Sequence, residues 1–543
     1  MIDMQGKIAQ LFPQATFETV DNVLTVKIDD ARLHALAQTL RDDDVFAMDY
    51  LVTIVGMDWK DSLGCVYYLM STRHNNMIAI KVSTTDRERP MLHSVADLWH
   101  IAGLYEREVY DFFGIIFIGN PDMRRLFLSI DWHGHPLRKD YDMDPAFNRV
   151  STENERQSDD TNIYIEDADG NVTCQTAHIF EPGDFVVNIG PQHPATHGVL
   201  RFRTAVDGET IKKIDVYMGY IHRGVEKLCE DLTYPQTLHY MDRLDYFAAH
   251  NYHHGLCITY EKAAGIEVPR RAQVIRVLMD ELSRIASHCL FIGTYCMDLG
   301  ATTMLFYTLR VREQILDIME KTCGARMTFN YDCIGGVMQD LDVDFVKDVH
   351  ALLDVLPANI KEYNKLFTGN VIARNRMEGV GVLSREDAIS YGVTGPAGRA
   401  SGWACDMRKL MPYSIYNELE FDEIVRSEGD SMARFKARIS EMEQSARIIS
   451  QLIDSIPEGE YCAKVPKVIK LPQGSWFTLV EGCRGAFGIY LESDGSTKPY
   501  RLKIAPPCLP LAGVVDHITR GDKIADLITI GGSLDYIVPD MDR

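Results

Sequence analysis

The sequence predicts two folded parts: an α+β N-terminal domain and a mainly α-helical bundle with small β-sheets in the C-terminal part. Three observations support this fold class. In residues 1–141, β-like runs alternate with short helical segments. Residues 142–184 carry 11 acidic and two basic residues and few apolar ones. Beyond them, apolar residues recur every three or four positions over long segments, which is typical of bundled helices.

The composition is that of a globular protein with a large apolar core. The chain has 543 residues, 46% of them hydrophobic and 25% charged, which is enough for two or three domains. Its net charge of −22 would repel nucleic acid, so we expect no nucleic-acid partner. No run of 18 or more uncharged apolar residues occurs, and the N-terminus lacks the features of a signal peptide, so we expect the chain to stay in the cytoplasm.

The cysteines and glycines argue against several cofactor sites. The 12 cysteines are scattered without any CxxC pair, and no GxGxxG motif is present. We therefore expect this chain to hold no metal, iron–sulfur cluster, flavin or nicotinamide of its own.

The first domain, residues 1–141, should alternate between helices and strands. Periodicity predicts helices at 4–12, 31–41 and about 94–114, and strands at 17–28, 50–55, 66–71 and 77–82. The last of these helices ends in Glu106-Arg-Glu-Val-Tyr-Asp-Phe-Phe-Gly114. We interpret this cluster of acids and bases as a helix end that is salt-bridged within itself and to the following loop.

The acidic stretch, residues 142–184, is predicted to be an exposed tether. Its few apolar residues cannot bury enough surface for it to fold alone. It would join the first domain to a second one, residues 185–543.

Two histidines lie on a stiff loop between β-like runs at 185–189 and 199–206. Prolines 191 and 194 fix φ and glycines 190 and 198 permit turns, so the loop would hold His193 and His197 in place. Histidines four residues apart also occur in zinc sites, but that geometry requires a helix, which the prolines disfavour. Loop histidines that bind no ligand explain the pattern equally well.

In the second domain, periodicity predicts helices at 271–298, 304–322, 343–366 and 431–456 and a hairpin at 484–503 with an Asp-Gly turn. Asp298 stands at the end of the first of these helices in an apolar setting. It needs a partner, because a buried carboxylate without one is costly. Capping a neighbouring helix would also satisfy it, and Tyr240, in its apolar-flanked stretch, could be a core residue.

Several of these stretches resemble one protein family. The loop Gly190-Pro-Gln-His-Pro-Ala-Thr-His-Gly198, the segment Gly395-Pro-Ala-Gly-Arg-Ala-Ser-Gly402, the hairpin at 484–503 and the ending Asp-Met-Asp-Arg543 are similar to the hydrogenase-like D-type subunit of respiratory complex I. The region 106–141 resembles the C-type subunit of the same complex. The chain thus looks like a C/D fusion, joined at the acidic tether.

This resemblance implies an NADH:quinone oxidoreductase (translocase) subunit that acts only within the complex. It would pass electrons from a [4Fe–4S] cluster of a neighbouring iron–sulfur small subunit to a membrane quinone, coupled to proton pumping. Other implied partners are peripheral-arm and membrane-arm subunits. The implied location is the cytoplasmic side of the bacterial inner membrane, as a peripheral protein, and the implied fold of the second domain is that of nickel–iron hydrogenase large subunits.

The resemblance also assigns a quinone site. It implies that His193, His197 and Tyr240 are the quinone-binding residues, with His197 and Tyr240 in contact with the headgroup. It also implies that Asp298 pairs with His197 and that His193 and Gly198 shape the loop. These groups suit the chemistry, because a quinone presents two carbonyl oxygens that gain negative charge on reduction and need donors and protons.

Three further residues would lie toward the partner's [4Fe–4S] cluster: Arg201, Arg326 and Thr328. The last stands where the family commonly has histidine. Two more departures are Cys333, where the family often has arginine, and Met304, where it often has proline.

A nickel–iron hydrogenase is one alternative. Its soft metals need four thiolates in two CxxC pairs, but the corresponding positions hold Asp245, Ala248, Cys508 and Leu511. One thiolate cannot hold such a cluster. An assembly scaffold with an inactive pocket is the other alternative.

Overall fold

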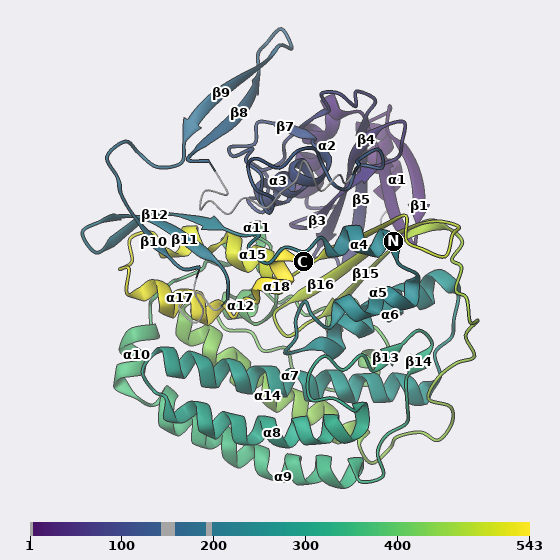
Figure 1. The fold of residues 1–543 in the computed structure, drawn as a ribbon, viewed down its shortest axis with the longest axis vertical. Coiled ribbons are helices and arrows are strands. Elements are labelled where there is room, and N and C mark those ends of the chain that lie inside the picture. Colours follow the sequence, from purple (N-terminus) through teal and green to yellow (C-terminus); the bar gives the residue numbers. More distant parts are fainter. Residues whose placement is uncertain (1–3, 143–157, 192–197) are drawn as a thin grey trace.

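The computed structural model describes residues 4–142, 158–191 and 198–543. Figure 1 shows the N-terminal sheet domain above a bundle of long helices, with the C-terminal elements between them. This arrangement confirms the predicted fold class.

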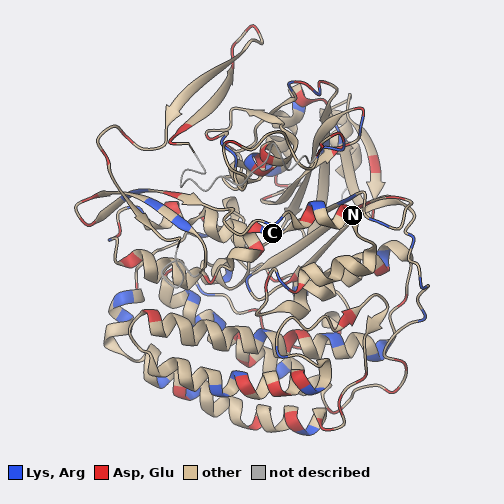
Figure 2. Ribbon diagram, in the orientation of Figure 1, with Lys and Arg blue, Asp and Glu red and all other residues tan. Residues whose placement is uncertain are grey.

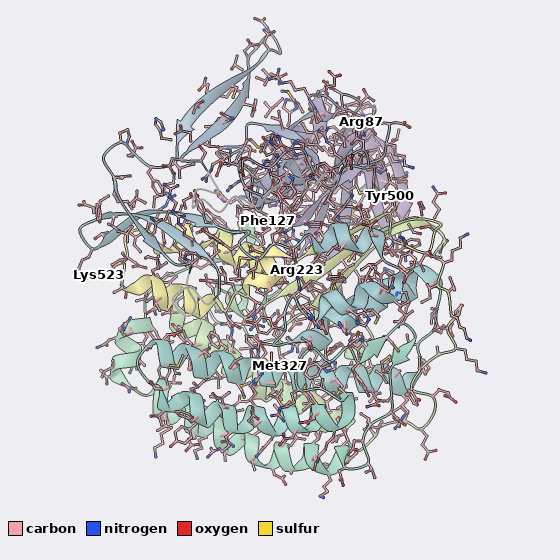
Figure 3. The ribbon with its side chains drawn as sticks, in the orientation of Figure 1. Arg87, Phe127, Arg223, Met327, Tyr500 and Lys523 are labelled. Carbon is pink, nitrogen blue, oxygen red and sulfur yellow. The ribbon has the colours of Figure 1, made fainter. Side chains whose placement is uncertain are left out.

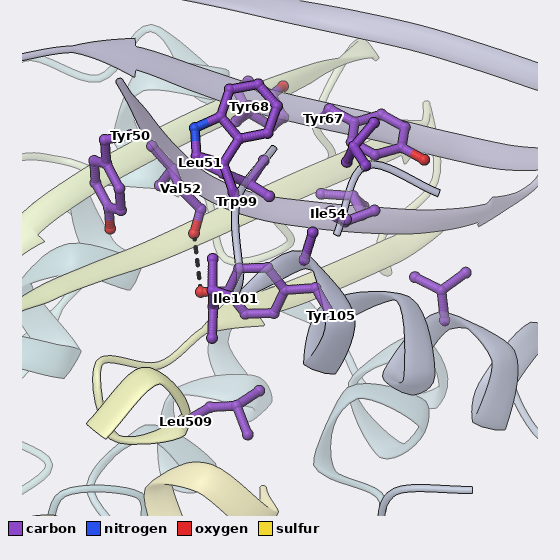
Figure 4. Close-up of a cluster of buried hydrophobic side chains, with 14 of the residues drawn as sticks. Tyr50, Leu51, Val52, Ile54, Tyr67, Tyr68, Trp99, Ile101, Tyr105 and Leu509 are labelled. Atoms are coloured by element: carbon purple, nitrogen blue, oxygen red, sulfur yellow. Dashed lines mark hydrogen bonds between the residues drawn. The ribbon is translucent and has the colours of Figure 1, made fainter. Parts of the chain in front are cut away.

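A five-stranded sheet in the order β1-β2-β5-β4-β3 forms the N-terminal domain. Its elements are α1 (Met4–Leu11), β1 (Thr16–Val20), β2 (Val23–Lys27), α2 (Asp30–Asp42), β3 (Tyr50–Asp58), β4 (Leu63–Ser71), β5 (Asn76–Thr84), β6 (Met91–His93), α3 (Ala102–Phe113) and β7 (Ile116–Ile118). Every residue of β3 and β4 is buried, so both faces of the sheet are covered. In Figure 4, Tyr105 of α3 donates a hydrogen bond to the carbonyl oxygen of Val52 (3.2 Å), and Leu509 of the second domain lies near the same cluster.

The helix predicted to start near residue 94 begins only at Ala102. Its Glu106 carboxylate accepts hydrogen bonds from the Ser94 hydroxyl (2.6 Å) and the Val95 amide (2.8 Å), which holds the preceding segment as a loop. The predicted helix-end salt bridges are confirmed only in part. Arg107 pairs with Asp122 of the following loop (3.1 Å). It does not pair with Glu106 or Glu108, because adjacent residues of a helix do not face each other.

Glu108 instead joins a buried ion cluster that connects the two halves of the molecule. It pairs with Lys503 and with the C-terminal residue Arg543. Glu226 completes the cluster, 3.0 Å from Arg543 and 2.8 Å from Arg501. Burial makes the pairing obligatory, since removing one partner leaves a charge without compensation.

The acidic stretch contains a β-hairpin that the tether prediction missed. Strand β8 (Asp160–Glu166) pairs with β9 (Val172–His178), and Figure 1 shows the hairpin projecting from the molecule. Most side chains of the hairpin are exposed, as the polar composition predicted. The strands pair nonetheless, because backbone hydrogen bonds form without an apolar core. His93 attaches it to the N-terminal domain, with ring nitrogens 2.6 Å from Asp30 and 2.8 Å from Glu166. The boundaries predicted for the two domains and the tether between them remain predictions.

Two three-stranded sheets belong to the second domain: β10 (Phe185–Ile189), β11 (Arg201–Asp207) and β12 (Thr210–Tyr217), and β15 (Gln473–Glu481), β16 (Ala486–Asp494) and β17 (Arg501–Ala505). The two runs predicted beside the histidine loop are therefore confirmed as antiparallel neighbours. The predicted hairpin is β16 and β17, which pair after a turn that begins at Asp494-Gly495. Two short strands, β13 (Asp332–Cys333) and β14 (Gly336–Val337), form a separate pair.

Long helices form the bundle: α7 (Arg270–Asp298), α8 (Thr303–Cys323), α9 (Phe345–Tyr363) and α14 (Ser431–Leu452). Of the 29 residues of α7, 22 are buried, so this helix is the centre of the bundle. Figure 2 shows charges of both signs intermixed on α8 and α9. Among the helices that the structure describes, none is both long and apolar enough to cross a membrane.

Shorter helices surround this core: α4 (Val225–Asp231), α5 (Tyr234–Met241), α6 (Ala249–Ala264), the π-helix Asn364–Thr368, α10 (Val371–Met377), α11 (Arg385–Ser390), α12 (Gly395–Ala400), α13 (Met407–Leu410), the 3-10 helix Tyr416–Glu418, α15 (Cys508–Gly513), α16 (Val515–Thr519), α17 (Asp526–Leu534) and α18 (Val538–Asp542).

Candidate functional site

Gly198, which closes the histidine loop, lies against a residue near the C-terminal end of the chain. His193 and His197 themselves lie outside the described residues, but Gly198 follows directly. A Cβ atom added to Gly198 would lie 2.4 Å from Cγ2 of Val538, and its φ of +149° also disfavours a side chain. Glycine is therefore needed here for the loop to approach Val538 at the start of α18.

Asp298 lies beside the same C-terminal segment. It is the last residue of α7 and is half-buried. Burial and, second, the negative charge of Asp298 raise the pKa of the Tyr536 hydroxyl above its ordinary value, so the carboxylate acts electrostatically on this buried tyrosine. We call residues 536–538 the C-terminal strap. Gly198 thus packs against Val538 of the strap, while the charge of Asp298 acts on Tyr536 of the same strap.

Tyr240 is set on the short helix α5. A capping box formed by Thr233 and Gln236 fixes the start of this helix. The half-buried Tyr240 ring packs against an apolar cluster of α5, α6 and the C-terminal sheet. Burial lowers the pKa of the Arg223 guanidinium, and the electrostatic effect of Tyr240 partly opposes this shift. Figure 3 shows Arg223 at the junction of the two halves, beside the C-terminal elements.

Asp245, at one of the positions compared with the nickel-binding cysteines of hydrogenases, forms a buried ion pair. Asp245 and Arg484 are fully buried and 2.7 Å apart. Cys508 accepts a hydrogen bond from the Ile537 amide (3.2 Å), and its own amide donates to Asp540 (3.2 Å). A single thiol beside a guanidinium does not suit a soft metal. In the described ranges, no group of three or more potential ligands could hold a metal ion.

The residues expected near the partner's cluster come from two elements. On β11, the Nε of Arg201 donates to the side chain of Asn188 (2.9 Å), and its guanidinium lies over the Tyr217 ring. Beyond the end of α8, Arg326 pairs with three carboxylates of that helix, including Asp317 (2.6 Å). Thr328 has a left-handed backbone with φ of +52°.

The other two departures from the family are both accommodated. Met304 is buried near the start of α8, and Cys333 ends β13 with its thiol half-buried.

Sequence reasoning missed the strap and the buried polar residues next to it. Tyr536 and Val538 are almost fully buried, and so are Asp540 and Arg484. The tyrosine Tyr252 donates a hydrogen bond to Asp540 (2.8 Å), and burial raises the pKa of this acid to about 6. The sequence did contain one signal for this region. Three aspartates stand among apolar residues at 535–542, and carboxylates in such a setting need buried partners.

Comparisons with known proteins identify the family. Two family models match: "Respiratory-chain NADH dehydrogenase, 30 Kd subunit" over residues 26–146 and "Respiratory-chain NADH dehydrogenase, 49 Kd subunit" over residues 298–543. The C/D subunit of the NADH-quinone oxidoreductase of Bacteroides thetaiotaomicron is 53% identical over 524 residues, which cover 94% of this chain and 98% of the relative. That of Phocaeicola vulgatus is 52% identical over 519 residues, 95% of this chain and 99% of the relative.

A relative without the first domain matches the second one. The D subunit of the NADH-quinone oxidoreductase of Dehalococcoides mccartyi is 46% identical over 361 residues, 66% of this chain and 98% of the relative. The fused organisation predicted from the sequence thus agrees with these matches. The chain belongs to the family of C/D subunits of NADH-quinone oxidoreductase, respiratory complex I.

Proposed function

We propose that residues 190–198, Tyr240 and Asp298 form one wall of the site where complex I reduces a membrane quinone. One observation carries this proposal. Gly198 packs against Val538 of the C-terminal strap and the charge of Asp298 acts on Tyr536 of the same strap, which supports an arrangement in which this carboxylate interacts with an imidazole of the loop.

The proposed roles follow from the charge that develops on the quinone. Each carbonyl oxygen becomes negative as electrons arrive, and a positioned donor stabilises that charge. His197 donates to one oxygen and the hydroxyl of Tyr240 to the other. A carboxylate beside an imidazole favours its protonated form, so Asp298 would keep a proton available on His197 for transfer. His193 and Gly198 set the shape of the loop.

The electrons come from outside this chain. We propose that Arg201, Arg326 and Thr328 face a [4Fe–4S] cluster held by the iron–sulfur small subunit, where a guanidinium stabilises the reduced cluster. Other peripheral-arm subunits deliver the electrons. Membrane-arm subunits couple the reaction to proton pumping, and the chain lies peripherally on the cytoplasmic side of the bacterial inner membrane.

Substitutions in the assembled complex test this function. His197→Ala and Tyr240→Phe should each abolish most quinone reduction, whereas electron transfer to a water-soluble acceptor that bypasses the quinone site should continue. His350→Ala is a matched control, because this histidine is exposed and pairs with exposed Asp454. Unchanged quinone reduction in both variants, with normal assembly, would favour the scaffold alternative.

A further inference from the structure

Two cysteines from distant parts of the sequence meet beside the bundle. The sulfur atoms of Cys333 and Cys462 are 3.9 Å apart. Gly336 pairs with Cys333 in the β13–β14 hairpin and forms an isolated bridge to Cys462 on its other side. Because Gly336 has no side chain, the side chains of Cys333 and Cys462 can approach each other across it until the thiols are in contact.

The backbone holds the two segments together closely. The Ala463 amide donates to the Gly335 carbonyl (2.8 Å), and the Val337 amide donates to the Tyr461 carbonyl (3.0 Å). A Cβ atom at Gly336 would lie 2.3 Å from the carbonyl oxygen of Tyr461. The contact between the two thiols is therefore built into the fold at this point.

The pair is partly accessible, unlike most thiols of the chain. Eight of the twelve cysteines are buried, but Cys333 and Cys462 are both half-buried. Cys333 also lines a cavity of about 320 Å³, together with Leu238, Met338, Val465 and Ile469. Met338 is 60% exposed, so the cavity has an open, apolar mouth through which a small molecule can approach the thiol pair.

We propose that Cys333 and Cys462 form a redox-active dithiol that a small organic disulfide converts reversibly into an intramolecular disulfide. In the first step, the Cys462 thiolate attacks one sulfur of the small disulfide and releases one small thiolate. The Cys333 thiol then loses its proton to water and attacks the Cys462 sulfur, releasing the second small thiolate. The dithiol loses two electrons and two protons, and the small disulfide is reduced to two thiols.

The order of attack follows from the burial of Cys333. Burial, with the neighbouring Cys462 as second cause, raises the pKa of the Cys333 thiol to about 12. Since the thiolate is the nucleophile, we assign the second, resolving attack to Cys333. To bond, the sulfurs must close from 3.9 Å to about 2.05 Å. Side-chain rotation and a shift of residues 461–463, which lie in a stretch without helix or extended strand, would supply this movement.

Mass spectrometry of the intact complex tests the proposal. The complex is treated with glutathione disulfide, its remaining thiols are blocked with N-ethylmaleimide, and it is digested with trypsin without reduction. Cys333 and Cys462 are the only cysteines of the tryptic peptides 327–347 and 448–464. We expect these two peptides to be linked in most molecules and separated again by dithiothreitol.

Internal controls make the result decisive. Exposed Cys174, in peptide 157–201, should gain glutathione and so report that the reagent is active. Half-buried Cys323, which contacts His250 rather than a thiol, should form no internal link. In a Cys462→Ser variant, Cys333 should remain a free thiol and the linked peptides should disappear. If Cys174 reacts while Cys333 and Cys462 stay unlinked, the proposal is wrong.

Discussion

Replacing Gly198 by alanine should push the histidine loop away from the C-terminal strap. The added Cβ would lie 2.4 Å from Cγ2 and 3.0 Å from Cβ of Val538. Apolar carbon atoms pack at about 3.5–4.0 Å, so this contact is far too short. Overpacking of this kind costs about 1–3 kcal/mol. Holding alanine at φ of +149° adds about 1–3 kcal/mol of backbone strain.

We expect the loop to relieve this strain by moving away from Val538, which would displace His197 from its proposed position at the quinone. We therefore expect kcat/KM for quinone to fall by about tenfold or more, because tenfold corresponds to about 1.4 kcal/mol of lost transition-state stabilisation. The assay is quinone reduction by the assembled complex. Electron transfer to a water-soluble acceptor should not change, which controls for assembly.

A double-mutant cycle identifies the cause. Val538→Ala removes the Cγ atoms that obstruct the new methyl group, so the Gly198→Ala/Val538→Ala variant should recover several-fold in kcat/KM over Gly198→Ala alone. The backbone strain should remain. If the two substitutions act independently, so that their effects on kcat/KM simply multiply, the strap does not position the loop and the reasoning fails.

Three further predictions concern charges. Arg543→Gln should destabilise the fold by about 3–5 kcal/mol and lower the yield of assembled complex on native gels, because it leaves buried carboxylates uncompensated. Arg520→Gln is the control: the exposed Arg520 pairs with half-buried Asp516, and its loss should leave the yield unchanged. The pKa of His93 is raised to about 9, mainly by its hydrogen bond to Asp30. The stability that its ionic contacts contribute is therefore fully present below the pKa of an unfolded histidine, about 6.5, and is lost as the pH rises through 9. Protease should therefore cut the β8–β9 hairpin faster at about pH 9.5 than at about pH 6.5, and His93→Gln should remove this difference. Since Thr328 cannot titrate near neutral pH, the potential of the partner's cluster should vary less with pH than in a Thr328→His variant, and redox titrations with equal slopes over about pH 6–8 would contradict this.

Local sequence patterns were sufficient to predict the long helices and several strands of the fold. The apolar face of residues 271–298 marked α7 to within one residue at its start. β-rich runs marked β3, β4 and β5, and an Asp-Gly pair marked the turn between β16 and β17. Each of these signals lies within the element that it predicts.

Contacts between distant residues could not be predicted in this way. Gly198 and Val538 meet across 340 positions of sequence, and Glu108 pairs with Arg543, yet no local pattern links either pair. The β8–β9 hairpin was missed because composition reports apolar burial, whereas this hairpin depends on backbone pairing and on a few anchors such as His93. Tyr240 and Asp298 were assigned by resemblance, and the structure adds the neighbours of each.

Labelling with a quinone analogue that carries a photoreactive group on its headgroup tests the central claim most directly. After irradiation of the assembled complex, mass spectrometry would locate the labelled residues on this chain. We predict labels within residues 190–198, at Tyr240 or beside Asp298. Labels confined to other surfaces, such as the cavity lined by Leu238 and Cys333, would contradict the proposed quinone site.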